Sequence, residues 1–469
     1  MKENFEPYHL SGGERIVSSE IPGARSKEIL EKQQRNESAI VSYSKQIPIA
    51  IKRAKGAIIE DEDGNHYIDF FSLAGVVNVG HCNDFVLEYV REQQDKLIHA
   101  LDFPTENKVA LIEKILNLLS PDVRDEFKVA FTGPSGSDAV EAAIKLARMF
   151  TGRQGVIAFQ GSYHGMTSGA LSATSNTSLR SGLGALVPDI HFIPYSYCYR
   201  CPFDLQKDTC RLQCVQYFRS LLENPHSGIA KPAAIILEPV QGEGGVVIPH
   251  DGFLEGIVQV AREHNIVVIF DEIQAGFFRT GKFLSSQHAG VVPDIYTMSK
   301  GIGGVGFPLA AIVYHQRIEK WSSGKHIGTF RGNQVSIAAG NGAFDFVAQT
   351  SLPDHVLRME SLLRDRLEQL QRRMPFIGEV RGRGLFFGIE YVKDKNSKEP
   401  DSDIVRKIRL LCFKKGLLFE IGGHYNNVIR FLPPLVITPA LIERAMAIFE
   451  EVNLSLSGLH AQDTATVHK

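Results

Sequence analysis

A lysine directly after an apolar run is the residue of this chain best suited to covalent chemistry. The run DIYTM, residues 294–298, predicts a short buried strand. Lys300 follows it, with four glycines and a proline in the next eight positions. A lysine at a strand end is usually a solvated charge, and glycines after a strand usually form a turn. A desolvated lysine, however, loses its proton easily and can attack a carbonyl carbon. The glycines would then clear room for a bulky planar ligand.

A second segment with the residue types of a binding site is FTGPSGSDAVEAAIKLAR, residues 131–148. It predicts a turn of small residues that opens a long helix. Ser135, Gly136 and Ser137 can present main-chain N–H groups and hydroxyls to an anion, and the helix dipole favours a phosphate there. Ser137 can also form a plain helix N-cap, with Glu141 in the first turns. The segment alone leaves both interpretations open.

Acidic residues end another apolar run, in IVVIFDEIQAGFFRTG, residues 266–281. Asp271 and Glu272 follow five apolar residues, and Gln274 offers an amide to a nearby oxygen. A carboxylate at the end of a buried strand costs desolvation free energy unless it meets a cation or a donor. Asp271 can therefore hold a protonated ring nitrogen, although a surface turn would place an acid there too.

The elements that must position these residues alternate between strands and helices. From about residue 127 to 320, short apolar runs alternate with amphipathic helical patterns, which indicates a mainly parallel sheet with helices on both faces. Ligands of such sheets bind at the carboxyl ends of the strands, where each candidate residue falls. The segment 48–72 predicts a hairpin around an EDG turn, and residues from about 84 to 120 have helical spacing. After about residue 350, segregated helices and strands predict a smaller α+β domain.

A phosphate turn, a carboxylate for a ring nitrogen and a buried lysine are together what pyridoxal phosphate requires. A nicotinamide cofactor is disfavoured, because no G-x-G-x-x-G follows the first strand of a βαβ unit. A P-loop is excluded, because the chain has no G-x-x-x-x-G-K-[ST].

From about residue 45 to 450, the chain resembles the class III (subgroup II) aminotransferases, which are pyridoxal phosphate-dependent enzymes of fold type I. The resemblance rests on six segments in order: SGSDAVEAAIKLAR, YHG, LEPVQGEGG, FDEIQAGFFRTG, MSKGIGG and GTFRGN. It implies an α/β fold with a mainly parallel, seven-stranded sheet. The implied domains are an N-terminal segment at 1–70 that joins the small domain, a large cofactor-binding domain at 71–345 and a C-terminal small domain at 346–469.

The resemblance also implies roles at the cofactor. Lys300 matches the Schiff-base lysine and proton shuttle, Asp271 the partner of the pyridine nitrogen, and Gln274 a neighbour of the phenolic oxygen. The remaining implied cofactor contacts are the phosphate turn, the stacking aromatic with the histidine beside it, and a phosphate ligand lent by a second subunit: Ser135, Gly136, Ser137, Tyr163, His164 and Thr329. The family pattern therefore implies a homodimer with shared active sites.

On the substrate side, Glu238 matches an acid over the cofactor, and Arg430 matches the arginine that grips the carboxylate of 2-oxoglutarate or glutamate. An exposed strand arginine is the ordinary alternative for Arg430. Arg331 is a further candidate for a substrate carboxylate, and an ion pair at a dimer interface is its alternative.

The motifs look most like those of the diaminobutyrate:2-oxoglutarate aminotransferases, although GVGFPLA and FFSLAGVVNVGH differ from them. The resemblance thus implies a small-molecule amino donor, L-2,4-diaminobutyrate, and a 2-oxo acid acceptor. Another omega-amino acid such as 4-aminobutyrate or ornithine is an alternative donor. A racemase or aminomutase uses the same scaffold, and a cofactor-binding regulatory protein is an alternative of another class.

Composition sets broader limits. The 469 residues are 43% hydrophobic and 22% charged, with a formal net charge of −2. This balance predicts no nucleic-acid or membrane partner. No apolar run is long enough for a membrane span, and the first residues lack a signal core, so we expect a cytoplasmic enzyme.

Four of the six cysteines cluster in sequence, at Cys198, Cys201, Cys210 and Cys214. Two short pairs can hold zinc or an iron–sulfur cluster, but the spacing matches no common pattern. We therefore expect reduced thiols and no metal. Cys82 and Cys412 are expected to be buried small hydrophobic residues.

Overall fold

The computed structural model describes the main chain of residues 4–467 and the side chains of residues 4–457. The chain divides into two compact units. One unit holds the described residues up to Asp84, Thr350–Val380 and the residues from Gly384 onward; the other holds Phe85–Gln349 and Arg381–Arg383. No helix among the described residues is both long and apolar enough to cross a bilayer.

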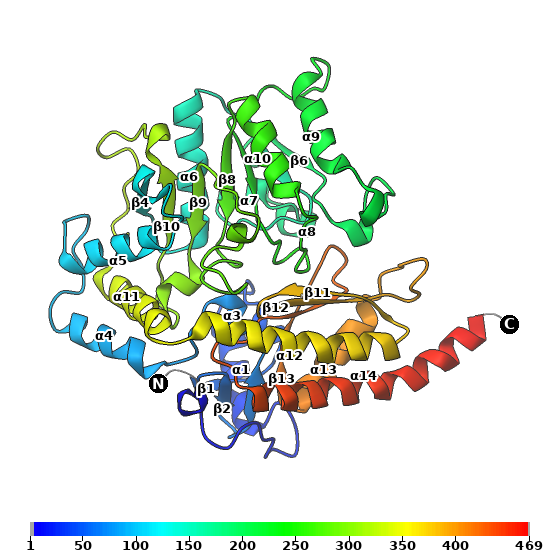
Figure 1. Cartoon of the computed structure of the whole chain (residues 1–469). Helices are drawn as coiled ribbons and strands as arrows, with labels where there is room; N and C mark the ends of the chain where they lie inside the picture. The colour runs from blue at the N-terminus through cyan, green and yellow to red at the C-terminus, as the bar shows by residue number, and fades with distance from the viewer. Residues whose placement is uncertain (1–3, 468–469) are drawn as a thin grey trace. The chain divides into compact units, whose positions relative to one another are not determined.

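The second unit is built on a seven-stranded sheet with the order β4-β10-β9-β8-β7-β5-β6, which confirms the predicted fold class (Figure 1). All neighbouring strands from β9 to β6 are parallel, whereas β10 runs antiparallel to both β9 and β4. The strands are β4 (Phe127–Phe131), β5 (Val156–Phe159), β6 (Ile190–Ile193), β7 (Ala234–Leu237), β8 (Val267–Asp271), β9 (Ile295–Met298) and β10 (Ala311–His315).

Helices surround this sheet in Figure 1. They are α4 (Asp84–Gln94), α5 (Glu106–Asn117), α6 (Gly136–Thr151), α7 (Ser168–Ala173), α8 (Thr177–Arg180), α9 (Gln213–Glu223), α10 (Phe253–Glu263) and α11 (Gln334–Gln349). The predicted helical segment 84–120 is thus two helices, because residues 95–105 between α4 and α5 form turns and coil.

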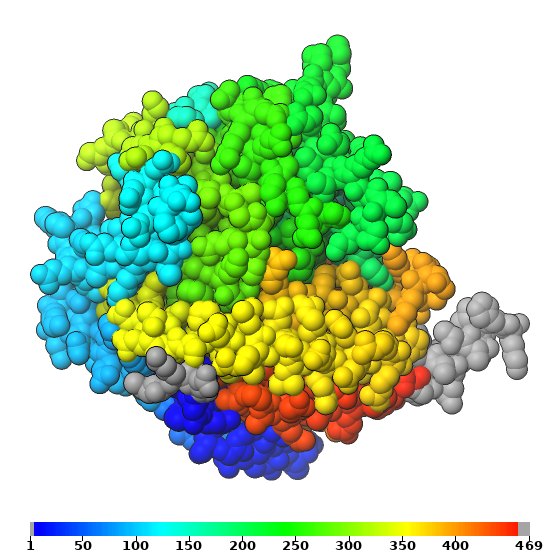
Figure 2. All heavy atoms as spheres, viewed as in Figure 1, coloured from blue at the N-terminus to red at the C-terminus, as the bar shows by residue number. Residues whose placement is uncertain are grey.

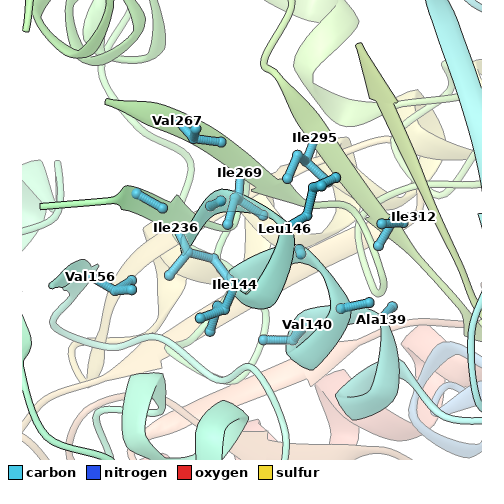
Figure 3. Close-up of a cluster of buried hydrophobic side chains, with 14 of the residues drawn as sticks. Ala139, Val140, Ile144, Leu146, Val156, Ile236, Val267, Ile269, Ile295 and Ile312 are labelled. Atoms are coloured by element: carbon cyan, nitrogen blue, oxygen red, sulfur yellow. The ribbon is translucent and has the colours of Figure 1, made fainter. Parts of the chain in front are cut away.

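Helix α6 anchors the core of this unit. Figure 3 shows its apolar side chains directed at the sheet. The buried cluster joins residues of α6 to residues of five strands, namely Ala139, Val140, Ile144 and Leu146 with Val156, Ile236, Val267, Ile269, Ile295 and Ile312. Fully burying one such aliphatic side chain contributes about 1.5–3 kcal/mol. The cluster therefore fixes the helix firmly over the strands that precede the candidate site.

The first unit contains two four-stranded sheets, with the orders β1-β2-β3-β13 and β11-β12-β15-β14. Their strands are β1 (Ile51–Lys55), β2 (Ile58–Asp61), β3 (His66–Asp69), β11 (Ile377–Arg383), β12 (Phe386–Tyr391), β13 (Leu417–Leu418), β14 (Glu420–Gly422) and β15 (Val428–Phe431). The predicted hairpin is confirmed, since β2 and β3 pair antiparallel across the EDG turn.

The helices of the first unit are α1 (Ala24–Asn36), α2 (Tyr43–Gln46), α3 (Ser72–Gly75), α12 (Leu352–Arg373), α13 (Ser402–Lys414) and α14 (Pro439–Val467). Helix α12 is amphipathic: its buried residues recur every three or four positions, at Leu352, Val356, Met359, Leu363, Leu367 and Leu370. Its outer face is the continuous yellow surface in Figure 2.

Candidate active site

One cavity of about 160 Å³, wholly within the second unit, gathers most of the predicted site residues. It is lined by Gly136, Ser137, Tyr163, His164, Gly165, Glu238, Glu243, Asp271, Ile273, Gln274 and Lys300. These residues follow the carboxyl ends of β5, β7, β8 and β9, or open helix α6. The neighbouring parallel strands thus bring to one edge side chains that are far apart in the sequence.

Lys300 lies directly beyond β9, at the first position of the 3₁₀ helix Lys300–Gly303, and is partly buried. Its φ of +51° falls in the left-handed region, which is costly for a residue with a side chain. The preceding Ser299 fixes the chain there, because its hydroxyl donates to the carbonyl oxygen of Leu309 at 2.9 Å. The backbone is therefore held in a strained conformation at the lysine expected to carry the chemistry.

The structural role of the glycines after Lys300 differs from the predicted one. None of Gly301, Gly303, Gly304 and Gly306 lines the cavity. A Cβ on Gly304 would stand 2.8 Å from the carbonyl oxygen of Ala339, in helix α11. At this position the missing side chain lets the segment pack against a helix, so the expectation that it clears room for a ligand is wrong for Gly304.

Asp271 ends the buried strand β8 and has a buried partner. Its Oδ2 lies 2.7 Å from Nδ1 of His164, and its Oδ1 accepts the main-chain N–H of Ile273 at 3.1 Å. The carboxylate of the neighbouring Glu272 instead accepts hydrogen bonds from Ser285 and Ser286. Asp271 is therefore the carboxylate of this pair that serves the cavity.

His164 is held on both sides. Its main-chain N–H donates to the hydroxyl of Thr174 at 2.9 Å, while its ring nitrogen Nδ1 meets Asp271. Its Nε2 is buried and has no hydrogen-bond partner among the described residues. A buried polar atom without a partner is costly, which suits a cavity that receives a polar ligand.

The start of helix α6 supplies donors for an anion. No hydrogen bond within the described residues engages the main-chain N–H of Gly136 or Ser137. The Ser137 hydroxyl accepts the N–H of Met166 at 3.2 Å. Ser135, by contrast, is exposed and forms a capping box, in which its N–H and hydroxyl both bond to the Asp138 carboxylate. The helix N-cap is thus Ser135, and the alternative that placed it at Ser137 was wrong, since Ser137 lies inside α6. Gly136 and Ser137 are the open donors.

Glu238 is buried at the end of β7 and binds main chain on two sides. Its Oε1 accepts the N–H of Tyr163 at 3.0 Å and its Oε2 accepts the N–H of Gly242 at 2.8 Å. Burial raises the pKa of Glu238 to about 7, and nearby Asp271 raises it too, whereas His164 and the two main-chain N–H groups act in the opposite direction. Glu238 therefore joins two loops that line the cavity.

Glu243 also lines the cavity, and the sequence analysis missed it. It lies in the run GEGG, five residues after the acid that drew attention. Burial raises the pKa of the Tyr163 hydroxyl, and the carboxylates of Glu243 and then Glu238 raise it further. The signal that could have found Glu243 is a charged residue flanked by glycines shortly after a buried strand.

Besides Ser135, three predicted residues do not line this cavity. Thr329 is exposed. Arg331 pairs with Asp102 at 2.5 Å and donates to the carbonyl oxygen of His326. Arg430, on β15 of the first unit, is 1% exposed and forms an ion pair with Glu420, its register partner on β14. Arg430 is therefore not the exposed strand arginine of the alternative interpretation.

The cysteines show no metal site. All six are free thiols, and no three His, Cys, Asp or Glu side chains of the described residues are grouped to hold a metal. Burial raises the pKa of the Cys198 and Cys214 thiols, which makes them less reactive. Cys412 is buried as expected, but the prediction was wrong for Cys82, which is exposed.

The residues of the cavity fit pyridoxal phosphate. Open N–H groups at the start of α6 suit the phosphate, and Asp271, backed by His164, suits a protonated ring nitrogen. Tyr163 supplies an aromatic face, and Lys300 supplies an amine in the same cavity.

Comparisons with known proteins agree with this geometry. The family Aminotransferase class-III matches residues 40–452. A relative from Rhizobium meliloti strain 1021, named diaminobutyrate–2-oxoglutarate aminotransferase, is 40% identical over 88% of this chain and 90% of its own length. A relative of the same name from Haemophilus influenzae is 38% identical over 91% of this chain and 95% of its own length.

Solved structures are similar over nearly the whole chain. A Bacillus anthracis aminotransferase superposes with a TM-score of 0.84 at 27% identity, covering 92% of this chain and 99% of that one. The taurine:2-oxoglutarate aminotransferase of Bifidobacterium kashiwanohense, solved with PLP and glutamate, gives a TM-score of 0.83 at 25% identity. It covers 95% of this chain and 99% of its own.

Proposed function

Because this chain belongs to the class III aminotransferases, we propose that it is a pyridoxal phosphate-dependent enzyme that transfers the terminal amine of L-2,4-diaminobutyrate to 2-oxoglutarate. The products are glutamate and an amino-acid aldehyde. The cavity that joins Lys300 to Asp271 and His164 is the observation that carries the reaction type. The names of relatives at 33–40% identity support the donor and the acceptor.

When bound, pyridoxal phosphate supplies an electron-withdrawing ring that eases removal of a proton from the carbon bearing the amine. We assign Asp271 to keep a proton on the ring nitrogen, with His164 orienting its carboxylate. The N–H groups of Gly136 and Ser137 would hold the phosphate, Tyr163 would supply the aromatic face for the ring, and Gln274 would serve the phenolic oxygen.

Lys300 is the base and acid of the proposed reaction. Its Nζ would remove the proton from the amine-bearing carbon of the donor and later return a proton, while the bound cofactor would supply the electron-accepting ring. The second half-reaction runs this transfer backwards on the 2-oxo acid. Arg430 grips the acceptor's carboxylate in this scheme, because a guanidinium binds a carboxylate in bidentate fashion.

The proposal includes a homodimer with shared sites. Large apolar side chains are exposed on two adjoining segments of the second unit, with Phe103, Ile327 and Phe330 at 69%, 73% and 67% exposure. The segments touch, since the rings of His99 and Phe330 lie 5.8 Å apart. Exposed apolar patches of this kind usually mark protein interfaces. Thr329 lies in the same patch, which suits a residue that reaches the phosphate of a neighbouring subunit.

A donor panel tests the proposed substrate. The purified protein, loaded with cofactor, is given diaminobutyrate, ornithine, 4-aminobutyrate, taurine or alanine with 2-oxoglutarate, and glutamate is measured by mass spectrometry. We expect diaminobutyrate to give the highest kcat/KM, and no turnover when 2-oxoglutarate is omitted. A higher kcat/KM with another donor would contradict the substrate, and turnover without a 2-oxo acid would contradict the reaction type.

A further inference from the structure

We propose that Arg381 is a positioning residue for this reaction, because it fixes the turn Gly242–Val246 and thereby the place of Glu243 in the cavity wall. The inference rests on the proposed function. Arg381 lies near the end of β11 and belongs to the second unit together with the turn. It is 8% exposed.

The guanidinium of Arg381 donates hydrogen bonds to main-chain carbonyl oxygens of the turn. Its Nε donates to the carbonyl oxygens of Gly245 and Val246 at 3.0 and 3.1 Å, and its Nη2 donates to that of Gly245 at 2.7 Å. Nη2 also donates to the hydroxyl of Tyr197 at 3.0 Å, and the guanidinium carbon lies 4.9 Å from the Tyr197 ring centre. A planar fork is required to reach these acceptors together, and the point charge of a lysine cannot replace it.

The turn needs such a clamp because its backbone is strained. Val246 is β-branched and has a φ of +53°, in the left-handed region that favours glycine. Its N–H donates to the carbonyl oxygen of Gly242 at 3.1 Å, and Gln241 and Val247 exchange two hydrogen bonds that close the base of the turn. Strained conformations persist where the surrounding structure over-determines them, and they concentrate at functional sites.

Two ionisable side chains hold the turn from its two ends. The acceptor is Glu238, whose carboxyl oxygen receives the N–H of Gly242 at one end. The cationic donor is Arg381, which binds the carbonyl oxygens of Gly245 and Val246 at the other end. Glu243 lies between these two anchors and lines the cavity. Loosening the Arg381 anchor therefore moves Glu243 relative to Lys300, while the residues assigned to the cofactor keep their own supports.

A fixed position of Glu243 would contribute to the specificity for the amino donor. A carboxylate in the cavity wall attracts an ammonium group, and diaminobutyrate carries a second ammonium besides the one that reacts. Glu243 can serve the donor only at a defined distance, which Arg381 sets through the turn.

The first test is hydrogen–deuterium exchange on the cofactor-loaded protein, which does not depend on activity. Arg381→Lys should speed exchange at least tenfold in peptides covering residues 242–247. Arg383→Lys is the matched control, because Arg383 lies two residues further on the same strand and has no hydrogen bond to the turn among the described residues. Unchanged exchange in Arg381→Lys, or an equal change in the control, would overturn the proposal.

The second test is a double-mutant cycle in kinetics. Arg381→Lys should lower kcat/KM for diaminobutyrate about tenfold and leave the apparent Kd of pyridoxal phosphate within twofold. In the Glu243→Gln background the same change should cost less than twofold, because Arg381 acts through Glu243. A tenfold loss in both backgrounds, or a matching loss of cofactor affinity, would show a general structural role and overturn the proposal.

A milder variant covers the case in which Arg381→Lys does not fold. Tyr197→Phe removes one acceptor of the guanidinium and keeps the ring beneath it. Like Arg381→Lys, it should speed exchange in the turn and lower kcat/KM for diaminobutyrate, but by a smaller factor. The kinetic effect should vanish in the Glu243→Gln background. Equal losses in both backgrounds would overturn the proposal. If the native protein fails with diaminobutyrate, the proposed substrate falls, whereas the exchange test still decides the role of Arg381 at the turn.

Discussion

The buried carboxyl of Glu238 leads to a pH-dependent prediction of stability. Burial raises its pKa from 4.5 to about 7. A carboxyl with a higher pKa in the folded chain stabilises the fold fully below pH 4.5, and that stability is lost as pH rises through about 7. Linkage with these two values gives a contribution of about 2.5 kcal/mol at pH 5 and close to zero at pH 8.

Glu238→Gln removes this titration, because glutamine does not ionise. The Tyr163 and Gly242 N–H groups bind different carboxyl oxygens, so in the variant one of them faces the amide NH2, which is a donor, and loses its acceptor. The free-energy cost of losing this hydrogen bond does not change with pH, because glutamine has no titratable group. The free energy of unfolding of the native protein should therefore fall between pH 5 and pH 8 by about 2.5 kcal/mol relative to the variant.

Urea unfolding at a series of pH values measures this difference, with equal cofactor loading throughout. Glu255→Gln is the matched control, because Glu255 is an exposed acid in the first turn of α10. Its curve should run parallel to that of the native protein. Parallel curves for native and Glu238→Gln would refute the reasoning, since they would mean that Glu238 does not titrate between pH 5 and 8.

Three further predictions concern the proposed chemistry. Asp271→Asn should slow the chemical step far more than it weakens cofactor binding, as stopped-flow absorbance and a cofactor titration can show; a loss of affinity alone would make Asp271 structural. Arg430→Gln should raise KM for 2-oxoglutarate about tenfold to a hundredfold, because a charge-assisted contact contributes about 1.5–3 kcal/mol; an unchanged KM would remove its role. Mixing inactive Lys300→Ala and Thr329→Ala subunits should restore up to about one native site per mixed dimer, and no recovery despite verified exchange would place Thr329 in its own chain's site.

The sequence predicted the candidate site best for residues that stand at the carboxyl ends of strands. Lys300, Asp271 and Glu238 each follow an apolar run, and the runs became β9, β8 and β7, adjacent parallel strands of one sheet. Parallel pairing places their carboxyl ends together, so their grouping in one cavity could be predicted from order and period alone. The catalytic roles assigned to them stay predictions.

Other features depended on contacts that no local pattern encodes. Arg331 pairs with Asp102, 229 positions away, and Arg381 binds a turn about 135 positions away. Such pairings depend on tertiary packing, which is not visible in composition or spacing. Ser135 shows another limit: the sequence suited a phosphate ligand at Ser135 and a helix N-cap at Ser137. Only the hydrogen bonds to Asp138 showed that Ser135 is the cap and that its donors are already engaged.

The most direct test of the central claim follows the nitrogen itself. Diaminobutyrate labelled with ¹⁵N at the terminal amine is incubated with 2-oxoglutarate and the cofactor-loaded protein, and glutamate is analysed by mass spectrometry. The account predicts labelled glutamate from the native protein and none above background from Lys300→Ala. Unlabelled glutamate from this donor, or equal labelling with the Lys300→Ala variant, would contradict it.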